Sequence, residues 1–224
     1  MKTIRFYVCL CAVFYVSSLL AQEELGNGLL FPQFESGIVV FKNGTSTPAP
    51  LNYNMLEQKM LFLDNQNNMM EFADVSNILF IQIDERKFFP VSSRGIFYEE
   101  VVTGSGSYFV QHKANMVTQG KASAYGGFSQ TSAATSVSSI QDSQGGGPRI
   151  NLKANEQFKM NMERSYYIKS GISYKRFTSA KSLGKLFKGQ SAKIESFSKE
   201  QSINFSKPED IVKIVEYSFS LMGN

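Results

Sequence analysis

Between residues 37 and 113, short apolar runs alternate with turn residues. The β-branched and aromatic run at 38–41 stops at Asn43-Gly44, a strong two-residue hairpin signal, and 51–54 is interpreted as the returning strand. About eight closely spaced strands, with no long helical pattern among them, predict a mainly β (α+β) fold, either an antiparallel β-sandwich or a barrel-like meander. The remaining predicted strands are 59–64, 69–72, 77–84, 87–89, 94–102 and 107–113.

The segment 77–84 is the clearest of these strands. Leu79, Ile81 and Ile83 alternate with Phe80 and with the polar Gln82. Because successive strand residues point to opposite faces, we expect Leu79, Ile81 and Ile83 to share one buried face.

After residue 148 the pattern becomes partly helical. A further hairpin is predicted at 166–174, and Thr178 or Ser179 can cap a helix that extends to about 187. A second helix is predicted at 191–200. The last helix begins after Ser206, whose spacing to Glu209 predicts a capping box. Such short helices need tertiary packing, so we expect two or three of them to dock on the sheet.

The segment 118–148 has a different composition. Ser, Gly, Thr, Ala and Gln occupy 24 of its 31 positions, and only Lys121 and Asp142 are charged. Such a segment buries little apolar surface, which predicts a flexible low-complexity linker. An exposed strand pair built on Tyr125, Phe128 and Val137 is the alternative.

The N-terminus has the features of a secretory signal peptide. Lys2 and Arg5 precede an apolar stretch at 6–16, which is shorter than the roughly 20 residues that span a bilayer. Cleavage is expected after Ala21, and an uncleaved membrane anchor is the alternative. The predicted organisation is therefore a signal peptide at 1–21, an antiparallel β domain at 22–117, the flexible segment at 118–148, and a hairpin with C-terminal helices at 149–224.

Export limits the chemistry available to the mature chain. Both cysteines, Cys9 and Cys11, lie inside the signal peptide, so residues 22–224 can form no disulfide and no cysteine metal site. The expected location is the periplasm, the outer-membrane surface or the extracellular space, with no transmembrane segment after cleavage.

Charge gives one further indication of a partner. The whole chain carries a net charge of +4, which is not the balance of a nucleic-acid-binding protein. Seven basic residues nevertheless lie within 25 positions without an acidic residue between them. They indicate either a weak contact with an anionic surface or a solvated helix face. These residues are Lys169, Lys175, Arg176, Lys181, Lys185, Lys188 and Lys193.

No catalytic, cofactor-binding or metal-binding residue is predicted, and no cofactor is expected. His112, the only histidine, is interpreted as a strand histidine at a sheet edge. The acidic pairs Asp84-Glu85 and Glu99-Glu100 point to opposite strand faces, so each is expected to be solvated. The Asp64 loop offers one carboxylate and is interpreted as a turn.

Several motifs resemble a family of exported Bacteroidetes proteins of unknown function. They are Gly37-Ile38-Val39-Val40-Phe41-Lys42-Asn43-Gly44, Leu51-Asn52-Tyr53-Asn54, Met60-Leu61-Phe62, Asn77-Ile78-Leu79-Phe80-Ile81, Tyr166-Tyr167-Ile168, Lys181-Ser182-Leu183-Gly184-Lys185-Leu186-Phe187 and Pro208-Glu209-Asp210-Ile211. The resemblance covers most of the mature chain but implies no activity, cofactor or catalytic residue.

Three hypotheses about function remain open. The first is a non-enzymatic envelope or secreted protein that acts through contacts with a protein or another envelope component. The second is a carrier of a small apolar ligand or lipid, which needs a barrel-like interior. The third is a hydrolase, which needs two carboxylates that converge in a cleft.

Overall fold

The computed structural model describes residues 28–118, 121–122, 128–129 and 158–222. The predicted signal peptide and most of the predicted flexible segment lie outside these residues.

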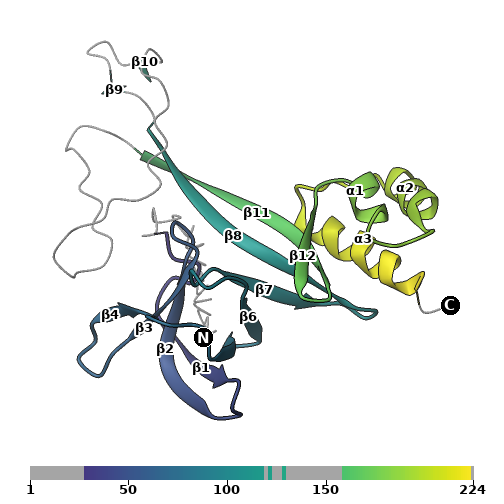
Figure 1. The fold of residues 1–224 in the computed structure, drawn as a ribbon. Helices are drawn as coiled ribbons and strands as arrows, with labels where there is room; N and C mark the ends of the chain where they lie inside the picture. The colour runs from purple at the N-terminus through teal and green to yellow at the C-terminus, as the bar shows by residue number, and fades with distance from the viewer. Residues whose placement is uncertain (1–27, 119–120, 123–127, 130–157, 223–224) are drawn as a thin grey trace, which may run out of the picture.

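Ten strands form one open antiparallel sheet in the order β12-β11-β8-β7-β6-β5-β1-β2-β3-β4 (Figure 1). The mainly β class is confirmed, with a single sheet that is not closed. The strands are β1 (Glu35–Phe41), β2 (Ser46–Asn54), β3 (Lys59–Leu63), β4 (Met69–Glu71), β5 (Ile78–Ile83), β6 (Arg86–Pro90), β7 (Phe97–Val102), β8 (Ser107–Thr118), β11 (Phe158–Ser170) and β12 (Ser173–Phe177); β9 (Lys121–Ala122) and β10 (Phe128–Ser129) form a separate pair.

The predicted hairpins are present. Strands β1 and β2 pair around Asn43-Gly44, where Gly44 has a positive φ of 86° and the Asn43 side chain accepts a hydrogen bond from the Thr45 N–H. The predicted partners at 59–64 and 69–72 pair as β3 and β4, and the hairpin at 166–174 is formed by β11 and β12.

The predicted buried face of β5 is wrong at one position. Ile81 and Ile83 are buried, but Leu79 is 45% exposed. A bulge causes this difference, because Val40 of β1 pairs with Phe80 whereas Phe41 pairs with Ile78. Leu79 is the extra residue, and a bulge interrupts the alternation of side chains between the two faces.

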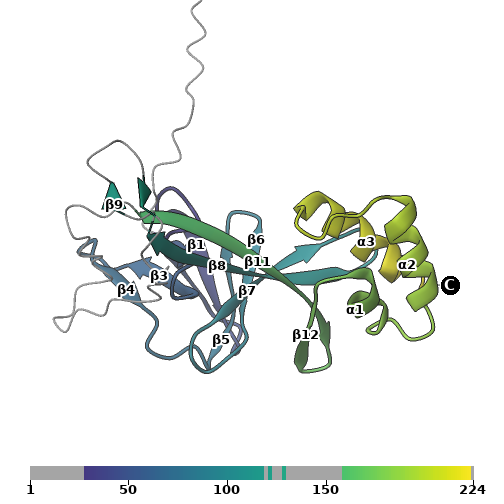
Figure 2. The same ribbon diagram turned by 90° about the horizontal axis from the view of Figure 1, so that it is seen from above.

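Two hydrophobic clusters lie at opposite ends of the molecule (Figures 1 and 2). The first is enclosed by the curled strands β1 to β7 and includes Leu51, Ile81 and Phe88. The second joins the inward side chains of β8, β11 and β12 to the helices, and it includes Val110 and Ile214.

The end of β2 and the turn that follows it form hydrogen bonds with β7 and β8, which stabilise the curled part of the sheet. The Met55 carbonyl accepts a hydrogen bond from the Ala114 N–H of β8 at 2.9 Å. The buried Tyr53 hydroxyl donates to the carbonyl oxygens of Phe97 and His112, at 3.2 and 3.1 Å. The first cluster is therefore covered by backbone as well as by side chains, although the sheet stays open.

Three helices follow the sheet, as expected: α1 (Ala180–Gly184), α2 (Ser191–Glu200) and α3 (Pro208–Ser220). Ser179 caps α1, and its side chain and that of Ser182 form a reciprocal capping box. Within the described residues, no helix combines the length and the apolar character needed to cross a membrane.

The predicted cap of the last helix is wrong. Lys207 is the N-cap of α3 and makes no side-chain capping bond, while Pro208 is the first helical residue. Proline fixes the backbone entry here without losing a hydrogen bond. The Asp210 carboxylate instead accepts a hydrogen bond from the Asn204 N–H at 3.1 Å, so an acidic side chain ties the preceding loop to the first turn.

The bulge in β5 can be tested by comparing two substitutions. Ile81→Ala removes a fully buried side chain, so it should lower the free energy of unfolding by about 2–5 kcal/mol. Leu79→Ala should cost less than about 1 kcal/mol, because that side chain is largely exposed. Urea denaturation measures both, and equal losses would show that Leu79 shares the buried face.

Candidate binding surface

From β5 to β12, the sheet packs one of its two faces against the hydrophobic clusters and leaves the other face partly exposed. The helices pack against Tyr108, Val110 and Tyr166, which all point to the inner face. The opposite face carries six aromatic side chains from six adjacent strands, and we call it the aromatic face. Its aromatic residues are Phe80, Phe89, Tyr98, Phe109, Tyr167 and Tyr174.

Strand register brings these residues together. Phe89 is directly opposite Tyr98, and Phe109 is directly opposite Tyr167. Directly opposed residues lie on the same face of a sheet, so rings that are distant in the sequence become neighbours.

The six rings are in continuous contact. Centroid distances are 5.6 Å for Phe80–Phe89, 5.9 Å for Phe89–Phe109 and 4.9 Å for Phe109–Tyr174. The Tyr174 ring is in turn 5.4 Å from the Tyr98 ring, and the Tyr98 ring is 4.6 Å from the Tyr167 ring. Most of these pairs are edge-to-face or tilted, the geometry in which aromatic contacts are favourable beyond their buried area.

Five of the six rings of this ladder are partly accessible to solvent. Phe109 is buried among its neighbours, whereas the other five rings are partly exposed. The same face also carries Ile38, which is 44% exposed, and Val102, which is 74% exposed. Contiguous exposed apolar surface of this kind is typical of interaction sites, whereas isolated apolar residues are not.

Polar side chains on the aromatic face contact two of its rings. The Tyr167 hydroxyl donates to Gln111 at 2.7 Å, and Lys87 lies 5.3 Å from the Phe80 ring. Burial, and then the hydrogen bond with Tyr167, raise the pKa of Tyr98 above its ordinary value. Tyr98 is therefore neutral at physiological pH and can act as a hydrogen-bond donor.

A buried ionic cluster lies on the inner face, between the two hydrophobic clusters. Arg86 binds Glu99 through both carboxylate oxygens, at 2.7 and 2.8 Å, and His112 Nε2 lies 2.5 Å from Glu99 Oε2. The Arg86 guanidinium also lies 4.9 Å from the Phe31 ring and 5.5 Å from the Phe88 ring. All three polar side chains are thus engaged with one another.

Two predictions about these residues are wrong. His112 is not at a sheet edge, because β8 pairs with both β7 and β11. Glu99 is buried rather than solvated, although Glu100 does point to the other face as expected. The overlooked signal is alternation: Glu99 lies between Phe97 and Val101, and His112 lies between Val110 and Ala114, in the two-residue period of a buried face.

Surroundings keep Glu99 ionised. Burial opposes ionisation, but the hydrogen bonds from His112 and Arg86 outweigh it and lower the pKa of Glu99 to about 2. The cluster therefore holds a negative charge between two apolar regions, and its partners compensate that charge.

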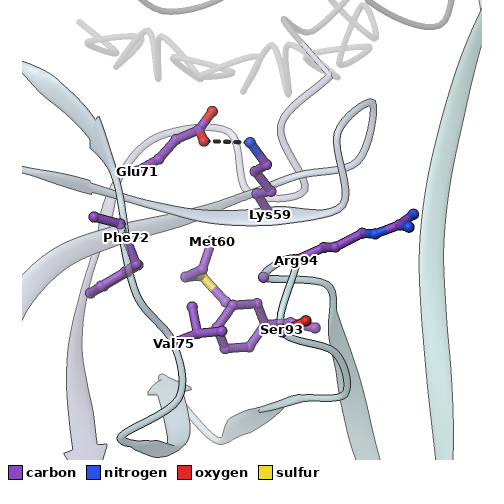
Figure 3. Close-up of a pocket in the computed structure, with 10 residues that line it drawn as sticks. Lys59, Met60, Glu71, Phe72, Val75, Ser93 and Arg94 are labelled. Atoms are coloured by element: carbon purple, nitrogen blue, oxygen red, sulfur yellow. Dashed lines mark hydrogen bonds and ion pairs between the residues drawn. The ribbon is translucent and has the colours of Figure 1, made fainter.

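One small pocket opens beside β3 and β4 (Figure 3). Its volume is about 240 Å³, below the roughly 300–1,000 Å³ of most small-molecule sites. Met60 and Val75 line its apolar side, and Lys59 bridges to Glu71 at 2.5 Å near its rim. Arg94 is the third charged residue of its lining, and Lys59 also lies 3.8 Å from Glu57, whose pKa is raised by burial and then by the neighbouring Glu71.

The remaining candidate residues lie where the sequence indicated. Asp64 accepts hydrogen bonds from the Gln66 and Asn68 N–H groups, which makes its loop a turn. Asp84 and Glu85 are exposed, and so are all seven residues of the basic run. Within the described residues, no group of three or more His, Cys, Asp or Glu side chains could hold a metal ion.

Comparisons with known proteins give no match: no protein-family model, no curated protein and no solved structure is similar to the chain. The resemblance to exported Bacteroidetes proteins therefore stays a prediction.

Glu99→Gln tests the buried cluster. The substitution leaves Arg86 without its charged partner, so at pH 7 the free energy of unfolding should fall by about 3 kcal/mol. This value is near the lower end for buried ion pairs, because Arg86 is partly exposed. The pKa is lowered from 4.5 to about 2, so the stabilisation is complete above pH 4.5 and is lost as the pH falls toward 2.

Urea denaturation at several pH values measures this effect. The difference between wild type and variant should shrink below pH 4.5, and a constant difference would contradict the assignment. Glu100→Gln is the matched control, since this carboxylate is on the opposite face and partly exposed. It should change stability by less than about 1 kcal/mol.

Proposed function

We propose that this chain is a non-enzymatic interaction protein of the cell envelope or the secreted fraction, and that the aromatic face is its binding surface. The observation that carries the proposal is the ladder of six touching rings on a sheet face that no described element covers.

The composition of this face suits recognition of a protein. Its aromatic residues are tyrosine and phenylalanine, and polar residues on the same face include Lys87, Gln111 and Glu100. Protein interfaces are enriched in aromatic residues at the centre and are polar at the rim. Rigid rings also lose little conformational entropy on binding, and their packing against one another holds them in place before a partner arrives.

The same observations give less support to the other two hypotheses. A carrier needs an internal cavity, whereas the curled end of the sheet is filled by side chains such as Leu51, Ile83 and Phe88. A hydrolase needs two converging carboxylates with access to a substrate. Glu99 is instead bonded to Arg86 and His112, and Glu57 and Glu71 share Lys59.

The test is capture of partners from native cells by the tagged full-length chain after crosslinking. A Tyr98→Ala/Tyr174→Ala variant removes two rings of the ladder, and central aromatic residues of an interface often contribute 2 kcal/mol or more each. We therefore expect a wild-type partner to be depleted at least about tenfold from the variant sample, as measured by quantitative mass spectrometry.

Phe62→Ala provides the matched control. Phe62 is also a partly buried ring, packed on Phe72 at 4.8 Å, but it lies at the first hydrophobic cluster and away from the aromatic face. It should keep the partner. Equal capture by wild type and both variants would contradict the proposal, and thermal denaturation would confirm that both variants are folded.

A further inference from the structure

Charge is divided between the two ends of the molecule. The described residues 28–118 contain six Lys and Arg and nine Asp and Glu, a net charge of −3. Residues 158–222 contain twelve Lys and Arg and six Asp and Glu, a net charge of +6. The second segment contributes β11, β12 and the helices, so the excess positive charge lies toward the helical end of the molecule (Figure 1).

The positive charge is concentrated beside the last hairpin. Helix α1 packs against β12, and Figures 1 and 2 both place them side by side. All six basic residues of this region are exposed, and we call the region the basic edge. It consists of Lys169, Lys175, Arg176, Lys181, Lys185 and Lys188.

Little of this charge is neutralised internally. Arg176 lies 4.0 Å from Glu163, and both side chains are about half exposed, so their interaction is weak. Glu100 is the other carboxylate nearby, and it accepts a hydrogen bond from the Ser107 hydroxyl. No acidic residue is close in the sequence to Lys175, Lys181 or Lys185, and all three residues are exposed.

An apolar side chain stands at the tip of the same hairpin. Ile172 follows Gly171, whose φ is 61°, and its side chain is 100% exposed. Strand β11 runs antiparallel to β8, so this turn is at the same end of the sheet as the turn between β7 and β8. The exposed Val102 is at that end too.

An exposed isoleucine alone indicates little. A β-branched aliphatic residue at a hairpin tip, where a polar residue would fit equally well, gains from exposure only if it enters an apolar medium. Basic side chains around such a tip suit a surface whose charge is negative and whose interior is hydrocarbon. A soluble acidic polysaccharide would use the lysines but would leave Ile172 without a role.

We propose that the basic edge docks on an anionic lipid bilayer, with Ile172 inserted at the boundary between headgroups and acyl chains. Lys169 and Lys175, each three residues from Ile172 along the hairpin, then lie nearest the lipid phosphates. The basic edge borders the aromatic face, because Lys169 is directly opposite Tyr174 and Arg176 is directly opposite Tyr167.

The test is co-sedimentation of the full chain with vesicles. Vesicles made of equal parts phosphatidylglycerol and phosphatidylcholine should bind it, whereas phosphatidylcholine alone should not. Ile172→Ser should weaken binding at least about tenfold, because burial of the side chain is lost. Lys175→Gln/Lys181→Gln/Lys185→Gln should weaken it by about fivefold per lysine, and added salt should weaken wild-type binding.

Two control variants make the result specific. Ile38→Ser removes an exposed apolar residue from the aromatic face, and Lys42→Gln removes an exposed lysine from the curled end. Both should bind vesicles like wild type. The substituted side chains of the basic edge and its tip are exposed, so these variants should retain the wild-type Tm.

Three outcomes would overturn the proposal. One is vesicle binding without preference for phosphatidylglycerol, and another is equal loss of binding in Ile172→Ser and Ile38→Ser. The third is binding to soluble dextran sulfate, unaffected by Ile172→Ser, together with no binding to vesicles. That result would assign the basic edge to an acidic polymer instead.

Discussion

Strand β8 provides the pairing on which the rest of the structure depends. It bonds to β11 along ten residues from Phe109 to Thr118, while its other edge is shared by β7 and the Met55 carbonyl. Its inward side chains pass from Val110 in the helix-covered cluster to Ala114 in the curled cluster. His112 lies between them, so the ionic cluster marks the point where one core ends and the other begins.

Local patterns in the sequence predicted much of the fold. Apolar runs and turn residues located nearly every strand, because hairpin pairing follows directly from alternation and turn chemistry. The position of Leu79 could not be predicted, since a bulge depends on the offset between two strands. The aromatic face could not be predicted from the sequence for the same reason. Phe89 and Tyr167 come to the same face only through the register of the strands between them.

The proposed binding surface and the core lie on opposite faces of the sheet. Inward side chains stabilise the fold through burial, and the buried carboxylate of Glu99 is compensated by Arg86 and His112. Outward rings are held by contact with one another, so they form an ordered surface without a covering layer. Substitutions on the aromatic face can therefore alter this surface while the core on the other face remains intact.

The pairing of Thr118 with Phe158 has an evolutionary consequence. The chain leaves β8 and enters β11 at adjacent points, so the sheet sets no requirement on the number of residues that connect them. Doubling the length of such a connection costs only about 0.6 kcal/mol in closure entropy. The pairing of β8 with β11 can therefore survive insertions and deletions between these two positions.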